Sequence, residues 1–157
     1  MIRPIQSKDN RALRAVVREV LESFGANREG FAYVDPELDD MHEAYSSKGS
    51  RYYVLELDGA IVGGGGIGPL EGAPSEYCEL KKMYFAEAAR GRGWGRRMIE
   101  QCLVDARAFG YRYCYLETLE TMDAAKHLYR DYGWSPRTQP FGDTGHGGCD
   151  VWMMKEL

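Results

Sequence analysis

The sequence lacks any long hydrophobic run. No stretch approaches the roughly 20 apolar residues that a membrane-spanning helix needs, and the opening Met1–Pro4 has none of the apolar core of a signal peptide. Cysteine is also scarce, because only four occur in 157 residues and none are paired as C-x-x-C. A chain this long does not depend on a disulfide framework. We therefore expect a cytoplasmic protein without a membrane partner, whose cysteines act as small apolar residues.

An excess of positive charge is missing as well. The formal net charge is −4 and the sequence pI is about 5.4, which argues against a nucleic-acid partner, since such binding needs a basic face. Hydrophobic residues make up 44% of the chain and charged residues 28%, the balance of a folded protein. The length fits one domain better than two, so we expect a single domain over residues 1–157.

The hydrophobic pattern alternates between strand-like and helix-like periods. Asp58-Gly59 is a strong hairpin signal between two runs of strand formers. Helices followed by strands later in the chain imply crossover connections, so we predict an α/β fold with a mixed sheet and helices on both faces. The predicted strands are 2–5, 52–57, 60–67, 76–85, 111–117 and 149–154, and the predicted helices are 7–24, 37–43, 93–109 and 122–132.

Two glycine-rich segments compete for a phosphate-binding role. The first, Gly63–Gly68, formally contains G-x-G-x-x-G after a strand. A dinucleotide site also needs a helix that opens at the third glycine, because the helix N-terminus holds the pyrophosphate. Pro69, Gly72 and Pro74 follow instead. We therefore interpret this run as a strand whose missing side chains let a helix or a substrate pack closely.

The second segment, Arg90–Arg97, lies between a strand and an amphipathic helix, and reads Arg-Gly-Arg-Gly-Trp-Gly-Arg-Arg. Glycines permit a tight left-handed turn with uncovered N–H groups, and a helix N-terminus attracts anions. Arginines at that end oppose the helix dipole by about 0.3–1 kcal/mol each, which is unfavourable unless an anion binds. The segment is not a P-loop, because no Gly-Lys-Ser/Thr closes it. It predicts a phosphate cradle.

Three segments together resemble the GNAT superfamily of acyl-CoA-dependent N-acyltransferases. Arg90–Gly95 is similar to its pyrophosphate motif Arg/Gln-x-x-Gly-x-Gly/Ala. Cys78–Phe85 resembles the strand that precedes that turn, and Ala125–Trp134 resembles its Ala-x-x-Leu-Tyr-x-x-x-Gly-Phe signature. The tail Asp143–Asp150 is similar to one subgroup of bacterial members. The specific resemblance covers residues 76–136.

The resemblance implies a V-splayed sheet of about six to seven strands flanked by about four helices. Acetyl-CoA would enter between the strands at 79–85 and 113–117, with no metal involved. The pantetheine arm would pair with the strand backbone, and the pyrophosphate would sit on the turn. The implied cofactor-binding residues are Met83, Tyr84, Phe85, Arg90, Gly91, Arg92, Gly93, Trp94, Gly95 and Arg96. The family often has Asn where this chain has Met122, so Thr121 or Asp123 substitutes for that amide or the contact is lost.

Acetyl transfer to an amine needs a base for the amine proton and an acid for the departing thiolate. By resemblance Tyr129 is the acid, and a phenol with a reference pKa near 10 is in its donor form at pH 7. Glu79 aligns with a glutamate that serves as base in some members, while Glu117 and a water chain remain rivals. We expect Glu79 to share a strand face with Lys81 and Met83. Desolvation near a cleft would raise the pKa of the Glu79 carboxyl.

Two further segments have weaker signals. His146 and Cys149 form an H-x-x-C pair, but zinc needs more ligands at matching spacing. We expect this pair to pack a loop against a strand, and a Cys–His nucleophile stays open. The acidic stretch 35–43 either attracts a cationic amine or is a solvated helix face.

The sequence thus predicts an acetyl-CoA-dependent N-acetyltransferase that acts by direct transfer in a ternary complex. The alternative is a CoA-binding sensor or interaction module without catalysis. The acceptor is not identified: a small amine, amino acid, polyamine, antibiotic or protein amine fits equally. A homodimer is common among proteins of this resemblance.

Overall fold

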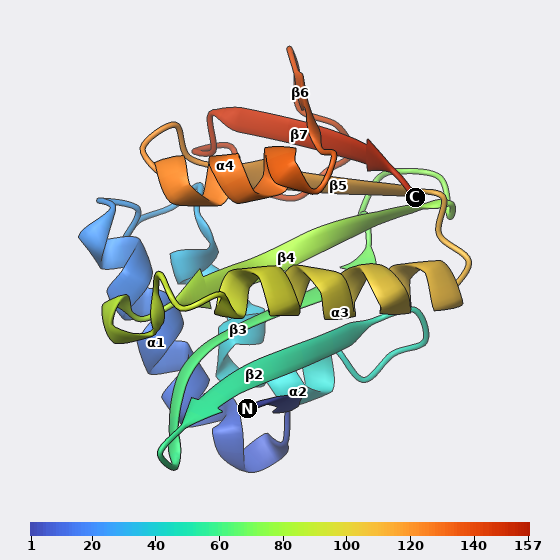
Figure 1. Ribbon diagram of the computed structural model, residues 1–157. Helices are drawn as coiled ribbons and strands as arrows, with labels where there is room; N and C mark the ends of the chain where they lie inside the picture. The colour runs from blue at the N-terminus through green and yellow to red at the C-terminus, as the bar shows by residue number, and fades with distance from the viewer.

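The computed structural model describes all residues from 1 to 157. Seven strands form one sheet, flanked by four α-helices (Figure 1). The mixed sheet expected from the sequence is therefore confirmed. The strands are β1 (Ile2–Pro4), β2 (Arg51–Leu57), β3 (Ala60–Pro69), β4 (Tyr77–Phe85), β5 (Tyr113–Thr118), β6 (Ser135–Arg137) and β7 (Val151–Glu156). The helices are α1 (Asn10–Ser23), α2 (Met41–Ala44), α3 (Trp94–Ala108) and α4 (Asp123–Asp131).

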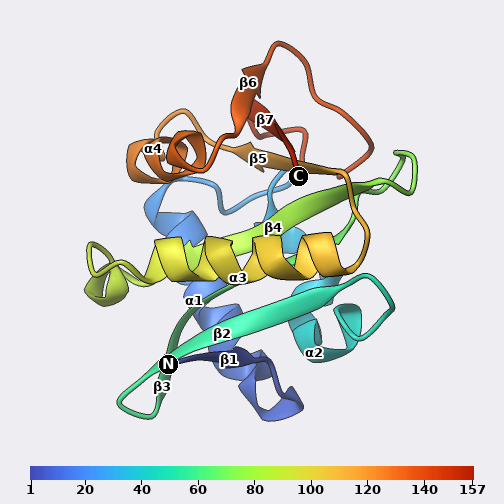
Figure 2. The ribbon, with the colours of Figure 1, turned by 45° about the vertical axis from the view of Figure 1, so that its right-hand side comes forward.

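The strand order across the sheet is β1-β2-β3-β4-β5-β7-β6. Every neighbouring pair is antiparallel except β4 and β5. That parallel pairing covers only Tyr77–Tyr113, Cys78–Cys114 and Glu79–Tyr115. Beyond Glu79 the two strands no longer pair, so the sheet opens into two arms, and Figure 2 shows β4 and β5 diverging.

A β-bulge bends β4 just past that point. Its register with β3 shifts between Gly64 and Gly66, and Lys82 lies in the left-handed region at φ 48°. The bulge turns Lys82 to the face that carries Glu79, where it contacts Asp35. Met83 turns to the opposite face, beside Gly65. The expectation that Glu79 shares its face with Met83 is wrong, because simple alternation does not survive the extra residue.

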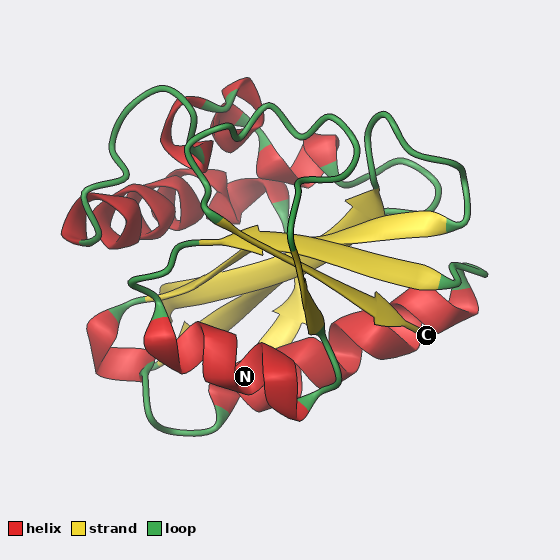
Figure 3. Ribbon diagram, turned by 90° about the horizontal axis from the view of Figure 1, so that it is seen from above, coloured by secondary structure: helices red, strands yellow, loops and turns green.

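Helices cover both faces of the sheet, with α1 and α2 on one side and α3 and α4 on the other (Figure 3). Each layer has its own buried apolar cluster. Leu13, Val17 and Leu21 of α1 belong to one cluster, and Met98, Ile99 and Cys102 of α3 to the other. These α1 and α3 positions follow the three- and four-residue spacing that buries one helix face.

The glycine run at residues 63–66 is part of β3. Neighbouring residues occupy the space that side chains at these positions would need. A Cβ on Gly64 would lie 2.7 Å from the ring of Tyr52, and one on Gly65 would lie 3.0 Å from both Met83 and Met98. The run therefore brings β2 and α3 close to β3. No helix opens after it, which agrees with the structural interpretation and not with a dinucleotide site.

Most predicted elements occur within a few residues of their expected bounds. The acidic stretch differs, because Asp40 interrupts it between a 3₁₀ turn at Pro36–Asp39 and the single turn of α2. The short strand β6 was not predicted. None of the helices has the length and apolar character that crossing a membrane requires. Cys78, Cys102 and Cys114 are buried free thiols, as expected.

Candidate active site

A large cavity lies where the two arms of the sheet separate. Its volume is about 610 Å³, within the range of small-molecule sites. The end of β4, the turn before α3 and the first half of α4 form most of its wall. Nine of the ten predicted cofactor-binding residues line it: Met83, Tyr84, Phe85, Arg90, Gly91, Gly93, Trp94, Gly95 and Arg96.

The turn before α3 presents backbone donors to this cavity. Gly91 and Gly93 have φ values of 69° and 81°, which a side chain at either position would strain. No hydrogen bond within the chain occupies the N–H groups from Gly91 to Arg96. These donors stand at the N-terminus of a 15-residue helix, so the turn is built to receive an anion.

The side chains of the turn differ in where they lie. Arg90 and Arg96 line the cavity, whereas Arg92 is exposed and outside its wall. Arg96 also forms an ion pair of 2.7 Å with Asp131. The indole Nε1 of Trp94 is buried and has no hydrogen-bond partner, an orphaned donor that needs an acceptor. A polyphosphate-bearing ligand fits this combination of free donors and cations.

Beyond the bulge, Met83–Phe85 has an unpaired backbone edge. Gly64 pairs with Tyr84 and Gly63 with Phe85 on the β3 side, whereas pairing with β5 has already ended at Glu79. An extended amide-bearing chain can add to such an edge as a strand would. Opposite it, Thr121, Met122 and Asp123 line the cavity, so both polar neighbours of the methionine lie on this wall.

A second, smaller cavity adjoins the first and contains the acid–base candidates. Its volume is about 40 Å³, and Met83, Tyr84 and Met122 line both cavities. Glu79, Glu117, Tyr129 and His146 also face the smaller one. The two predicted catalytic residues, Glu79 and Tyr129, thus lie in one cavity although 50 positions separate them in sequence.

Glu79 is only 5% exposed, and its carboxylate accepts no hydrogen bond. Burial raises its pKa to about 7, and the nearby Glu117 adds to the rise while Lys81, His146 and Lys82 oppose it. A carboxyl with this pKa is divided between its two protonation states at neutral pH. Such a group can accept a proton in one step and release it in the next.

Tyr129 projects from α4 and is 6% exposed. Its ring meets Trp134 edge-on, with centroids 6.0 Å apart, and its hydroxyl forms no hydrogen bond within the chain. Burial raises its pKa above the ordinary value of 10. The phenol therefore stays protonated at neutral pH and has its donor free, in the wall of the smaller cavity.

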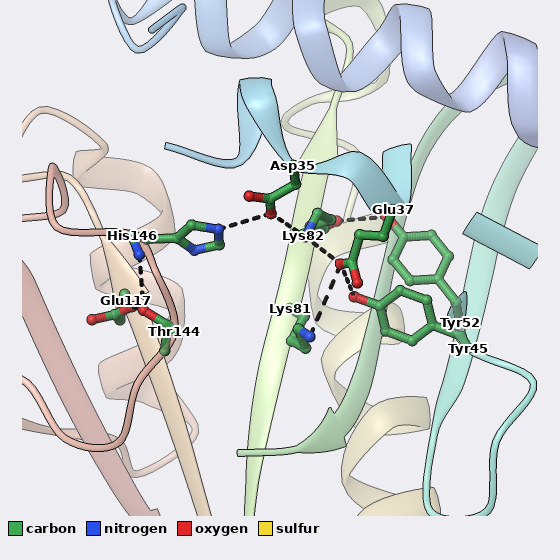
Figure 4. Close-up of polar contacts among 9 residues, drawn as sticks. All are labelled: Asp35, Glu37, Tyr45, Tyr52, Lys81, Lys82, Glu117, Thr144 and His146. Carbon is green, nitrogen blue, oxygen red and sulfur yellow. Dashed lines mark hydrogen bonds and ion pairs between the residues drawn. The ribbon is translucent and has the colours of Figure 1, made fainter. Parts of the chain in front are cut away.

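Residues 138–150, which we call the strap, connect β6 to β7, bring His146 to the wall of this cavity and bring Thr144 into contact with Glu117. Figure 4 shows His146 pointing at Asp35 and Thr144 at Glu117. His146 Nε2 lies 2.8 Å from Asp35 Oδ2. Burial opposes ionisation of Asp35, but the hydrogen bond with His146 and the charge of Lys82 outweigh it and lower its pKa. The expected packing role of this segment is therefore only part of what it does.

Two carboxylates of the acidic stretch 35–43, those of Asp35 and Glu37, neutralise the lysines of the bulge. Lys82 Nζ lies 2.6 Å from Asp35 Oδ2 and also contacts Glu37. Lys81 Nζ lies 3.9 Å from Glu37 Oε1. The hypothesis of a solvated face does not describe Asp35 and Glu37, which pair with β4 within the fold, but it does describe Asp39, Asp40 and Glu43, which are exposed.

One group of side chains has the composition of a metal site. Glu79, Glu117 and His146 each offer a ligand atom, and these atoms lie within 4.8 Å of one another. Cys149 is not part of the group. Burial raises the pKa of the Cys149 thiol to about 12, so a thiolate nucleophile at neutral pH is disfavoured. The H-x-x-C pattern in the sequence pairs His146 with Cys149 and gives no sign of Glu79 and Glu117. These two glutamates come close to the histidine only in the folded chain.

Comparison with known proteins defines the class. Residues 13–134 match the family model described as the Acetyltransferase (GNAT) family. The chain is 39% identical, over its whole length and 95% of the relative, to "Uncharacterized N-acetyltransferase YjgM" of Escherichia coli. A crystal structure of ribosomal-protein-alanine N-acetyltransferase from Brucella melitensis matches with a TM-score of 0.77 at 26% identity, covering 100% of this chain and 99% of that one.

A structure of yncA from Salmonella typhimurium with its cofactor acetyl-CoA has the same fold, at a TM-score of 0.76 and 20% identity, covering 100% and 93% of the two chains. The chain therefore belongs to the GNAT family of acetyltransferases. It is an acyltransferase, and acetyl-CoA is its cosubstrate. The function class and cosubstrate expected from the sequence are confirmed.

Proposed function

We propose that the enzyme transfers acetyl from acetyl-CoA directly to a primary amine while both are bound. The observation that carries the proposal is the adjacency of two cavities of different character. The larger has free N–H donors and arginines for a phosphate-bearing cosubstrate. The smaller cavity has the carboxyl of Glu79 and the phenol of Tyr129 in its wall. The two cavities share three lining residues, Met83, Tyr84 and Met122.

The cosubstrate would lie along β4 with its pyrophosphate on Gly91–Arg96 and its amide-bearing arm against Met83–Phe85. Helix N-termini and arginine forks are suited to phosphate. Arg92 contributes only to the local positive potential, since its side chain lies outside the cavity. When bound, acetyl-CoA supplies the activated acyl group, and every proton transfer is left to the protein.

Glu79 accepts the proton of the acceptor amine, and Tyr129 donates a proton to the thiolate that leaves. Their pKa values suit these directions, because a carboxyl near 7 serves as a base at neutral pH and a phenol above 10 remains a donor. Glu117, the rival base, is held by two hydroxyl donors. Both carboxylate oxygens of Glu117 therefore already accept a hydrogen bond, whereas the carboxylate of Glu79 accepts none within the chain.

The experiment that tests the proposal is a screen of primary amines with acetyl-CoA, with CoA release and N-acetyl product measured together. Transfer predicts equal amounts of the two products. The second candidate, a CoA-binding module without catalysis, predicts tight acetyl-CoA binding and no release. The Tyr129 hydroxyl, which forms no hydrogen bond within the chain and lies on a residue of the smaller cavity's wall, favours the enzyme because its proton is available to a leaving group.

A further inference from the structure

The strap has no part in the proton transfers described above, yet two of its residues, His146 and Cys149, form part of the wall of the smaller cavity. It is joined to the β5 arm, where the Phe141 N–H donates to the Tyr115 hydroxyl at 3.1 Å and Thr144 donates to Glu117. It is also joined to the other wall, where the Gly148 N–H donates to the Gly30 carbonyl at 2.9 Å. Together with the His146–Asp35 contact, these bonds connect the strap to β5 on one side and to residues 30–35 on the other.

The strap also fixes the carboxylate of Glu117. The Tyr115 hydroxyl donates to its Oε2 at 2.9 Å, and the Thr144 hydroxyl donates to its Oε1. The backbone N–H of His146 in turn donates to Thr144 Oγ1 at 3.2 Å. Both groups that donate hydrogen bonds to Glu117 are neutral hydroxyls, so they set its orientation without neutralising its charge.

The charges around the cavity leave a place for one cation. Lys81 and Lys82 line the cavity, but Glu37 and Asp35 already neutralise them. Neither Glu79 nor Glu117 forms an ion pair with any residue of the chain. Two carboxylates this close, one of them buried without a hydrogen bond, attract a positively charged ligand group.

The size of the cavity limits what that ligand is. A volume of about 40 Å³ is about three times the 10–15 Å³ that one water needs, enough for an ammonium nitrogen and a few carbons. Leu21, Phe31 and Leu119 give the rest of the wall an apolar character. The site therefore matches a compact primary ammonium ion with a short apolar body.

We propose that Glu117, oriented by Thr144 and Tyr115, binds the ammonium group of the acceptor, and that the strap restricts acceptors to small primary amines. Glu117 is the specificity-determining residue, and Thr144 is a positioning residue that acts through it. We expect protein N-termini and lysines to be poor acceptors, because His146 and Cys149 of the strap form part of the wall of a cavity of only about 40 Å³. This inference rests on the proposed function in one respect, that the acceptor occupies the smaller cavity.

The first test measures binding and needs no turnover. Propylamine and propan-1-ol have the same shape, but only the amine is cationic at pH 7, so the CoA-loaded protein is titrated with each by calorimetry. We expect propylamine to bind at least tenfold more tightly, and Glu117→Gln to remove the difference, since a hydrogen bond to a charged group typically contributes about tenfold or more. Glu156→Gln removes an exposed carboxylate on β7 as a control. Equal binding of amine and alcohol would overturn the inference even if acetyl transfer occurs.

The second test asks whether Thr144 acts through Glu117. Thr144→Val removes the hydroxyl and keeps the shape, and Thr144→Ser restores it. We expect the valine variant to weaken propylamine binding about tenfold, the serine variant to recover most of the loss, and the double variant with Glu117→Gln to be no weaker than Glu117→Gln alone. Losses that add in the double variant, with CoA affinity reduced equally, would show a purely structural role.

The third test concerns size. The same protein is given propylamine, phenethylamine and a pentapeptide with one free lysine, at equal concentrations, together with acetyl-CoA. We expect kcat/KM for the peptide to be at least a hundredfold below that for the better small amine. A peptide acetylated as efficiently as the small amines would overturn the restriction by the strap and leave the proposed transferase activity intact.

Discussion

Glu79 of β4 and Tyr115 of β5 form the last residue pair through which these two strands lie side by side. Immediately beyond them the bulge at Lys82 bends β4 away. Glu79 is thus placed where the two strands begin to separate, in the wall of the cavity proposed for the acceptor. The same divergence that opens a binding edge on β4 buries the carboxyl that would act there.

The pH dependence of the rate depends on Glu79. The base must be ionised, so kcat/KM should fall as pH drops below about 7, the pKa to which burial raises this carboxyl. Glu79→Gln should lower the rate by about 10²-fold or more and abolish this limb, leaving only the ionisation of the amine itself. A variant that keeps the limb near pH 7 would assign the base to another group.

Glu79 should also make stability depend on pH. Its pKa is raised from 4.5 to about 7 on folding, so its protonated form is favoured in the folded state and its contribution is lost as pH rises from about 4.5 to 7. By linkage the ionised carboxyl costs at most about 3 kcal/mol above pH 7. Glu79→Gln should therefore unfold at a higher temperature than the parent at pH 8, with the gain smaller at pH 5. Calorimetry at both pH values checks this, and an equal gain at both would contradict it.

Tyr129→Phe separates catalysis from binding. The ring fills the same space, but the free hydroxyl donor is lost, so kcat should fall by about 10²-fold, the low end for a general acid. The dissociation constant of acetyl-CoA should change by less than about threefold, and a steady-state and a calorimetric measurement on one preparation give both numbers. An equal loss of turnover and affinity would reduce Tyr129 to a packing residue beside Trp134.

The arginines of the turn should act on the phosphates alone. Arg90→Gln and Arg96→Gln should each weaken acetyl-CoA binding by about tenfold, as expected for a charge-assisted hydrogen bond. Binding of acetyl-pantetheine, which lacks the pyrophosphate, should not change. Arg92→Gln is the matched control, since its side chain is exposed and lies outside the cavity, and it should cost the least. A loss for Arg92→Gln equal to the other two would place the phosphates elsewhere on the turn.

The glycines of β3 should prove structural. A Cβ on Gly64 would lie 2.8 Å from the Tyr53 carbonyl, and overpacking of this kind typically costs about 1–3 kcal/mol. Gly147→Ala, where no atom lies within 4 Å of the new Cβ, should be nearly neutral. Urea unfolding of the two variants makes the comparison. If Gly64→Ala were as stable as the parent, close packing of Tyr52 against β3 would not require glycine at this position.

The sequence carries enough local information to predict the conformation of the glycine turn before α3. Its signal is contained in eight adjacent residues, Arg90–Arg97, and the structure has glycines at positive φ where they were expected. The helix that follows also ends near Gly110, as its pattern indicates. Properties that depend on a neighbouring turn or helix can be read from a single segment, because the residues that determine them are close in sequence.

The smaller cavity could not be predicted in the same way. Glu117 and Thr144 are 27 residues apart, and His146 and Asp35 are 111 apart. Their contacts depend on how the strap packs between β5 and the segment that contains Asp35. The bulge at Lys82 was also hidden, because a lysine carries no local signal for a left-handed backbone. The H-x-x-C spacing suggested a partnership between His146 and Cys149, whereas tertiary packing gives the histidine to Asp35.

The most direct measurement of the central claim is the release of CoA from acetyl-CoA in the presence of small primary amines, with the N-acetyl product quantified by mass spectrometry. The structure predicts release that depends on the amine, with one equivalent of N-acetylamine for each CoA and a loss of about 10²-fold in Tyr129→Phe. Tight binding of acetyl-CoA without amine-dependent release for any amine of the panel would contradict the account and identify a CoA-binding module instead.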